Sequence, residues 1–194
     1  MARKIEFDQE KIIAKAQDVY WTNGYEATSI QDLVDKLGIS RSSLYNTFED
    51  KHSLYISALA LYQQRQIQQL QSAVDAFGYS RQTIETIFHS ALDNALAYDL
   101  CRGCFLANSM VEMAKHDTDV VHLVTGYRTE IEEIFYQSLV TTQTAGELLT
   151  SVPDPRAMAR HLYSTLVGLN ALAKTKPDPQ VLKDIVNVAL SLIG

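Results

Sequence analysis

The four prolines of this 194-residue chain all lie in its C-terminal quarter, at positions 153, 155, 177 and 179. Proline interrupts the interior of a helix, so the first 152 residues are free to form long helices. Apolar residues there recur at intervals of three and four, as in Ile12, Ala16 and Val19, and the period-two alternation of strands is absent. The sequence therefore predicts an all-α fold.

Capping residues and glycines divide the chain into about nine helices. The first is expected to begin at an N-cap, Asp8, and to end at Gly24. The second is expected to begin with a capping box at Thr28, and Ser40 and Asp50 are expected to cap the next two helices. The expected helices cover about residues 8–24, 28–38, 40–48, 50–77, 80–98, 103–115, 117–143, 155–175 and 178–193.

The composition excludes several classes of protein. With 46% hydrophobic and 21% charged residues, the chain is neither disordered nor collagen-like. No apolar run approaches the roughly 18 residues of a membrane span, and the first residues lack the apolar core of a secretory signal. Two cysteines are too few for a secreted disulfide scaffold. We therefore expect a cytoplasmic protein with no membrane partner.

Residues 28–48 predict two short helices joined by the tight turn Leu37-Gly38-Ile39-Ser40, which is the geometry of a helix-turn-helix. The pattern alone also fits a simple corner between two helices. The charge does not favour nucleic acid: the whole chain has a formal net charge of −6, and residues 1–54 hold 7 Lys and Arg against 9 Asp and Glu. Any DNA binding must therefore depend on the chemistry of individual side chains.

The second helix of this unit has a small, polar, uncharged face. Leu44 and Phe48, four residues apart, predict its buried edge. The opposite face consists of Ser42 and Asn46, flanked by Ser43 and Tyr45. Asn can bond adenine through two hydrogen bonds, Ser can donate or accept, and a Tyr hydroxyl can reach a phosphate. Further candidates for phosphate contact are Arg41, Lys51 and Thr28, the last at a helix N-terminus.

The stretch NGYEATSIQDLVDKLGISRSSLYNTFEDKHSLY closely resembles the N-terminal signature of the TetR family of transcriptional regulators, and AGELLTSVPDPRAMARHLYSTLVGLNALAK is more weakly similar to the eighth-helix region of some members. The resemblance implies a DNA-binding domain at residues 1–50, with the helix after Ser40 as the recognition helix. It implies an effector-binding and dimerisation domain at residues 51–194, in which the last two helices pair two protomers. A helix-turn-helix three-helix domain would thus precede a helical ligand-binding domain.

On this resemblance, Thr28, Tyr45 and Lys51 occupy positions that usually hold phosphates, and Ser42, Ser43 and Asn46 occupy positions that usually face bases. Thr47 is a further candidate for DNA contact, but it stands where the family usually has a histidine, so the backbone contact assigned to that ring does not carry over directly. The family also implies a ligand-responsive regulator, most often a repressor that a small-molecule effector releases from a palindromic double-stranded DNA operator.

The two cysteines form the motif Cys101-Arg102-Gly103-Cys104 at the expected start of a helix. The helix dipole and Arg102 could lower a thiol pKa there, which leaves open a redox or electrophile sensor of the same fold. The alternative is that Cys104 is a buried packing residue. His116 and His122 follow at nearly zinc-finger spacing, but the intervening segment is helical and apolar, so no metal is expected.

No nucleophile with an adjacent base and no phosphate-cradling glycine loop is apparent, so neither an enzyme nor a cofactor is expected. A helical-bundle enzyme is a remote alternative. His89 and His161 are interpreted as core or interface residues.

Helical bundles hold ligands in their cores, between facing helices. The candidate ligand-binding residues are Phe88, Leu92, Cys104, Phe105, Asn108, Tyr127 and Tyr163, with Met110, Phe135 and Ser109 beside them. The alternative is that these aromatic residues form a solid core. The lack of a cluster of one charge favours a neutral or mildly polar, partly aromatic effector. The glutamine-rich stretch QQRQIQQLQ at residues 63–71 is interpreted as a solvated helix face.

The last expected helix carries one continuous apolar seam, made by Val181, Leu182, Ile185, Val188, Ala189 and Leu192. No later helix is available to cover it. The sequence therefore predicts a homodimer through the last two helices, and two-fold symmetry then requires a palindromic operator.

Overall fold

The computed structural model describes residues 9–97, 102–146 and 154–194. Within these ranges the chain forms nine helices and no strand, which confirms the all-α prediction. The helices are α1 (Gln9–Asn23), α2 (Ile30–Leu37), α3 (Arg41–Phe48), α4 (Lys51–Phe77), α5 (Arg81–Leu96), α6 (Phe105–Met113), α7 (Thr118–Thr144), α8 (Pro155–Ala173) and α9 (Pro179–Ser191). None of the described helices is long and apolar enough to cross a membrane.

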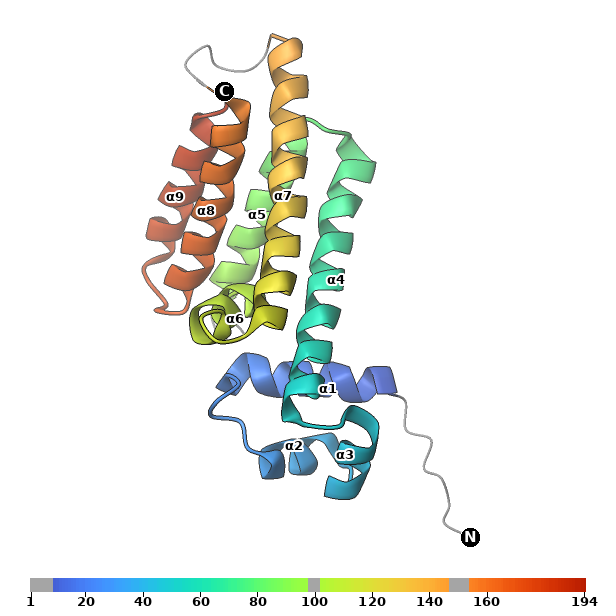
Figure 1. Ribbon diagram of the computed structural model, residues 1–194. Helices are drawn as coiled ribbons and strands as arrows, with labels where there is room; N and C mark the ends of the chain where they lie inside the picture. The colour runs from blue at the N-terminus through green and yellow to red at the C-terminus, as the bar shows by residue number, and fades with distance from the viewer. Residues whose placement is uncertain (1–8, 98–101, 147–153) are drawn as a thin grey trace.

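Helices α1, α2 and α3 form a small unit at one end of the molecule (Figure 1). The long helix α4 leaves this unit and runs beside α5 and α7, which form a bundle with α8 and α9, and the short helix α6 lies between the bundle and α1. Apolar side chains of α4 belong to two clusters. Leu54 and Leu59 pack with the α1–α3 unit, whereas Leu70 and Val74 pack with the bundle.

The core of the α1–α3 unit continues past residue 50. It includes Tyr55 of α4, Phe105 of α6 and Val120 of α7, all of which are buried. The helix-turn-helix therefore packs on elements of the C-terminal part of the chain, and the division of the domains after residue 50 stays a prediction.

Local capping signals locate most helix ends. Gly38 ends α2 in the left-handed region at φ 68°, and the side chains of Ser40 and Asp50 cap α3 and α4 as expected. The capping box of α2 is one residue later than predicted. Ser29, not Thr28, is the N-cap: its hydroxyl accepts from the backbone N–H of Asp32 at 3.1 Å. The expected N-cap Asp8 lies outside the described residues.

The expected single seam of α9 is divided between two faces. Leu182, Val186 and Ala189 are buried against the bundle, whereas Val181 and Val188 are exposed. The bundle thus covers one edge of the predicted seam, at Leu182 and Ala189, so the expectation that the whole seam is left uncovered within the chain is wrong. Leu192, the residue that follows α9, and Leu172 of α8 are exposed as well.

Candidate functional site

Helix α3 presents the polar face that the sequence predicted. The Ser40 hydroxyl accepts a hydrogen bond from the Ser43 backbone N–H at 3.1 Å and fixes the start of the helix. Leu44 and Phe48 are buried against the unit, which orients the rest of the helix outward. Arg41, Ser42, Tyr45 and Asn46 are exposed, and Ser43 and Thr47 are half-buried. This face carries neutral hydrogen-bonding groups of the kind that can meet base edges.

Two cationic side chains lie beside aromatic rings at the edges of this face. The Arg41 guanidinium is 5.8 Å from the centroid of the Tyr45 ring. The Lys51 ammonium lies 4.2 Å from the centroid of the Tyr25 ring, and the Lys51 carbonyl accepts from the Tyr20 hydroxyl at 2.9 Å. Both cationic side chains therefore stand at the ends of α3, Arg41 as its first residue and Lys51 as the first residue of α4.

Thr28 differs from the other candidates for DNA contact. Its side chain is buried, and its hydroxyl donates to the Gly24 carbonyl at 2.6 Å. A phosphate contact by this hydroxyl is therefore not available in the described conformation, because the side chain closes the turn between α1 and α2. The exposed Ser29 is the residue that stands at the N-terminus of α2.

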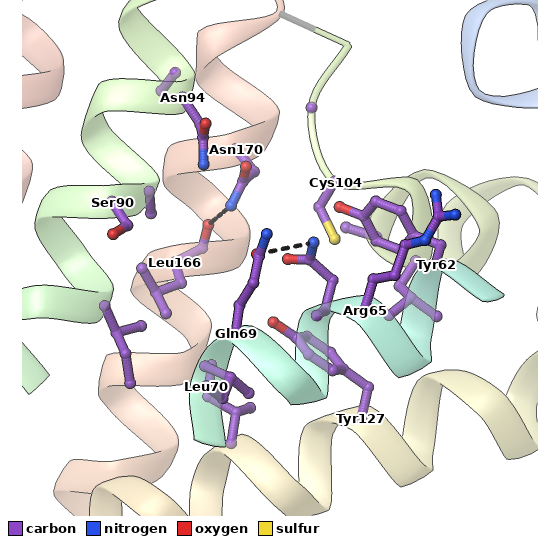
Figure 2. Close-up of a pocket in the computed structure, with 18 of the residues that line it drawn as sticks. Tyr62, Arg65, Gln69, Leu70, Ser90, Asn94, Cys104, Tyr127, Leu166 and Asn170 are labelled. Atoms are coloured by element: carbon purple, nitrogen blue, oxygen red, sulfur yellow. Dashed lines mark hydrogen bonds between the residues drawn. The ribbon is translucent and has the colours of Figure 1, made fainter. Parts of the chain in front are cut away.

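A pocket of about 990 Å³ lies between α4, α5, α7 and α8, and α1 and the start of α6 close one end of it. Figure 2 shows the Tyr62 ring of α4 directed toward Cys104, and the Gln69 side chain of the same helix directed toward Asn170. The interpretation of residues 63–71 as a solvated face is therefore wrong in part. Arg65, Gln66 and Gln69 line the pocket, and the Gln66 side-chain amide donates to the Gln69 side-chain oxygen at 3.3 Å.

The pocket lining includes three of the seven predicted ligand residues, Cys104, Tyr127 and Tyr163. Phe88 instead stacks on Phe135 inside the bundle core, with ring centroids 6.0 Å apart. Leu92 packs against the same core.

The other two predicted residues make contacts elsewhere. Phe105 is buried beside the rings of Tyr55 and Tyr62, because α6 packs on the α1–α3 unit. Asn108 donates to the Arg102 carbonyl at 2.9 Å and accepts from the Lys174 ammonium at 3.1 Å, so it ties the start of α6 to the end of α8.

Cys104 is the N-cap residue of α6 and lies near the hydroxyls of Tyr62, Tyr127 and Tyr163. Burial raises the pKa of the Cys104 thiol, although the backbone N–H of Ala107 and the Tyr62 hydroxyl act in the opposite direction. The expectation of a lowered thiol pKa is therefore wrong, because removal from water outweighs the helix N-terminus. Its expected partner Cys101 lies outside the described residues.

Both ends of α6 contact the α1–α2 region. Before the helix, the Trp21 indole N–H donates to the Gly103 carbonyl at 3.0 Å. Near its end, the Glu112 carboxylate accepts from the Glu26 backbone N–H at 2.9 Å. Gly24, at φ 85°, leaves room for that carboxylate, since a Cβ there would lie 3.0 Å from it. A movement of α6 would therefore be transmitted to the helix-turn-helix.

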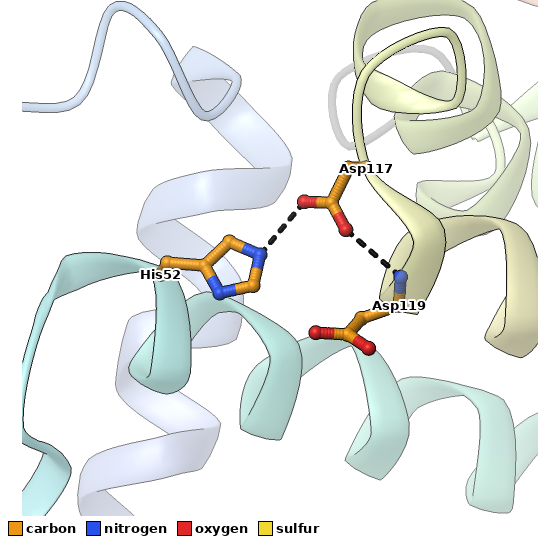
Figure 3. Close-up of side chains that lie close together, drawn as sticks. All are labelled: His52, Asp117 and Asp119. Atoms are coloured by element: carbon orange, nitrogen blue, oxygen red, sulfur yellow. Dashed lines mark hydrogen bonds and ion pairs between the residues drawn. The ribbon is translucent and has the colours of Figure 1, made fainter.

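A separate contact, which does not involve α6, joins the first turn of α4 to the start of α7, as Figure 3 shows. The His52 Nε2 atom lies 2.7 Å from the Asp117 carboxylate, whose other oxygen accepts from the backbone N–H groups of Asp119 and Val120. Burial raises the pKa of Asp117, but the Val120 N–H, His52 and the Asp119 N–H outweigh it, and the pKa is lowered. This carboxylate therefore caps α7 and holds the first turn of α4, immediately after α3.

Among the described residues, the side chains grouped closely enough to share a metal ion are His52, Asp117 and Asp119, with ligand atoms within 4.8 Å of one another. The histidines considered for zinc, His116 and His122, are exposed and do not belong to this group. Because both Asp117 oxygens already have hydrogen-bond partners, we interpret the group as a structural link.

Known proteins are similar to this chain over its whole length. A model of bacterial regulatory proteins of the tetR family matches residues 12–58, and a model of the tetracyclin repressor-like C-terminal domain matches residues 80–189. The uncharacterized HTH-type transcriptional regulator YezE of Bacillus subtilis (strain 168) is 32% identical over 193 residues, which is 100% of both chains. The HTH-type transcriptional repressor ComR of Escherichia coli (strain K12) is 25% identical over 96% of this chain and 89% of its own.

Solved structures share the fold. The TetR family transcriptional regulator CifR, as a cysteine mutant complexed with a 26bp double-strand operator DNA, superposes with a TM-score of 0.84 at 23% identity, over 100% of both chains. The reduced form of NemR from E. coli superposes with a TM-score of 0.84 at 18% identity, over 96% of each chain.

Proposed function

This chain belongs to the TetR family of DNA-binding transcriptional regulators, and from that premise we propose that it is a homodimeric repressor of a palindromic operator, released when a small molecule fills the pocket. The observation that carries the proposal is the exposed α3 face of Ser42 and Asn46, held on a buried edge and flanked by Arg41 and Lys51.

In this proposal Asn46 and Ser42, with Ser43, contact base edges. Tyr45, Thr47, Lys51 and Arg41 contact the sugar-phosphate backbone, which sets the register without reading sequence. The charge of −6 does not exclude this assignment, because Arg41 and Lys51 flank α3, although the carboxylates of Glu49 and Asp50 also stand at its C-terminal end.

The exposed apolar residues of α8 and α9 support the proposed dimer. Val181, Val188 and Leu192 recur at intervals of seven and four, and Leu172 of α8 is exposed as well. Pairing these helices with their copies in a second protomer would form a four-helix interface and remove these side chains from water. Each protomer would then place one α3 in a half-site, about one or more DNA turns from the other.

The two contacts of α6 with the α1–α2 region support release by a ligand. The pocket lining includes Gly103 and Cys104 at the start of α6, and this segment is bonded to Trp21 of α1. A ligand that binds more tightly to the dimer state in which the two α3 helices are misplaced must weaken DNA binding. By linkage, DNA must weaken the binding of that ligand by the same factor.

The test begins with selection of the operator from random DNA and measurement of transcription from it in cells. Deletion of the gene should raise that transcription, and a metabolite found by thermal shift should release the purified protein from the operator. A decrease in transcription after deletion would identify an activator instead. Metabolites that stabilise the protein without changing its operator affinity would contradict release through the pocket.

A thiol sensor of the same fold is the second candidate, and Cys104 in the pocket lining favours it. The raised pKa of this thiol opposes it, because the thiolate is the reactive form. Diamide would take two electrons and two protons from Cys101 and Cys104 to form a disulfide. Operator release by diamide or benzoquinone in wild type, absent in Cys101→Ser and Cys104→Ser, would support the sensor. Unchanged affinity after thiol modification verified by mass spectrometry would exclude it.

A further inference from the structure

Side-chain amides from three helices line the pocket. Gln66 and Gln69 extend from α4, Asn94 from α5 and Asn170 from α8. Figure 2 shows the side chains of Gln69 and Asn94 directed toward Asn170. Elements far apart in the sequence therefore bring carboxamide groups together in one space.

These amides keep hydrogen-bonding groups for a ligand. Gln66 Nε2 donates to Gln69 Oε1 at 3.3 Å, which leaves the Gln69 N–H groups as donors and the Gln66 oxygen as an acceptor. Asn170 Nδ2 donates to the Leu166 carbonyl at 2.9 Å, which leaves the Asn170 oxygen as an acceptor. Gln69 is exposed, and the unpaired oxygens of Gln66 and Asn170 are not buried, so a molecule in the pocket can reach all three.

The charges of the lining are balanced. Arg102 pairs with Asp18 at 3.1 Å, and the other charged residues of the described lining, Arg65 and Asp93, have opposite signs. An ion bound there would leave water without meeting a surplus of the opposite charge. The walls therefore favour a neutral molecule.

A neutral group that carries a donor beside an acceptor matches these amides best. A ligand carboxamide can accept from a Gln69 N–H through its oxygen and donate to the Asn170 oxygen through its own N–H. An ester offers acceptors only, and a carboxylate adds a charge. Leu70, Ile87 and Leu166 in the same lining are apolar and suit a hydrocarbon portion of the ligand.

We propose that the pocket binds a neutral amphipathic amide, whose carbonyl oxygen accepts from Gln69 Nε2 and whose N–H donates to Asn170 Oδ1. This inference rests on the proposed function in taking the pocket as the effector site. The ligand would bridge α4, which continues directly from the helix-turn-helix, and α8, a helix of the proposed dimer interface. Asn170 also lies against the start of α6, since a Cβ at Gly103 would be 3.1 Å from the Asn170 carbonyl oxygen.

The test uses four probes of equal chain length: octanamide, methyl octanoate, octanoate and octan-1-ol. Their flexible chains can follow the apolar walls in the same way, so the comparison isolates the head group. Calorimetry on wild type should show octanamide binding at least about fivefold more tightly than each of the others, because only its head group forms both hydrogen bonds without a charge. A pocket that recognised the chain alone would favour the less polar ester.

Two substitutions test the proposed partners. Gln69→Met and Asn170→Leu remove the amides and keep the approximate size of the side chains. The double variant should keep the circular dichroism spectrum of wild type and bind octanamide and methyl octanoate within about twofold of each other. Thr86→Val is the matched control, because Thr86 lines the same pocket but its hydroxyl already donates to the Gln82 carbonyl at 2.8 Å. This variant should preserve the preference for octanamide.

The inference is overturned if wild type binds none of the probes, or binds any of the other three as tightly as octanamide, and this comparison needs no variant. It is also overturned if the double variant keeps the preference. Operator binding in the presence of octanamide separates this inference from the proposed function. Octanamide that binds through Gln69 and Asn170 but leaves wild type on the operator supports the inference and contradicts release through the pocket. Release by a different metabolite after all four probes have failed does the reverse.

Discussion

Val188, 60% exposed on α9, is the residue whose truncation best tests the proposed dimer interface. Val188→Ala removes two methyl groups, and burial of a carbon of this kind contributes about 0.8 kcal/mol. Since about three-fifths of the side chain is exposed in one chain, the loss is about 1 kcal/mol per protomer and about 2 kcal/mol per two-fold dimer. The dimer dissociation constant should rise about 30-fold.

Sedimentation from nanomolar to micromolar concentration measures this constant. Val111→Ala is the matched control, because Val111 is 85% exposed and belongs to α6, not to the exposed apolar residues of α8 and α9. The control should leave dimerisation unchanged, and neither variant should alter the circular dichroism spectrum. Equal dimer constants for Val188→Ala, Val111→Ala and wild type would refute the assignment of the interface.

Three further predictions concern single side chains. Tyr45→Phe and Lys51→Ala should weaken binding to all DNA sequences uniformly, as an anisotropy titration measures. Lys51→Ala should also reduce the slope of log affinity against log salt by about 1. An unchanged operator affinity would argue against phosphate contacts. Tyr55→Phe removes the buried 2.7 Å bond to the Ser109 hydroxyl and should lower the free energy of unfolding by about 1 kcal/mol in urea, and no loss would show the bond to be neutral. Because the pKa of Asp117 is lowered in the folded state, the ionised carboxylate should stabilise the fold at neutral pH, and this stabilisation should disappear as the pH falls through that pKa. Asp117→Asn should therefore have a lower free energy of unfolding than wild type at pH 7 and the same free energy in acid. A difference between the two proteins that does not change with pH would contradict this assignment.

The helix ends could be predicted from the sequence because each depends on a few neighbouring residues. Gly38 supplies the left-handed residue after α2, and Ser40 and Asp50 accept from backbone N–H groups three positions later. The choice between Thr28 and Ser29 failed because both are hydroxyl residues. The turn between α1 and α2 decided it: the buried Thr28 hydroxyl donates to the Gly24 carbonyl, which leaves Ser29 to form the box with Asp32.

The pocket could not be predicted in the same way, because a polar residue on a cavity wall and one on the outer surface look alike in a sequence. Gln66 and Gln69 follow Tyr62 at intervals of four and three, so they share its inward face. That spacing was the available signal. The void itself depends on how α4, α5 and α8 are arranged, and no local pattern contains this information. Asn94 and Asn170 were overlooked for the same reason, since asparagine is ordinarily a surface residue.

The most direct test of DNA reading by α3 is a binding titration of wild type and Asn46→Ala against every single-base substitution of the selected operator. Asn46 is exposed on the polar face of α3 and is proposed to bond one base in each half-site. The account predicts that Asn46→Ala loses about 1–3 kcal/mol of discrimination at one base pair per half-site, at positions related by the two-fold axis, and keeps the preferences elsewhere. A preference profile identical to that of wild type would contradict it.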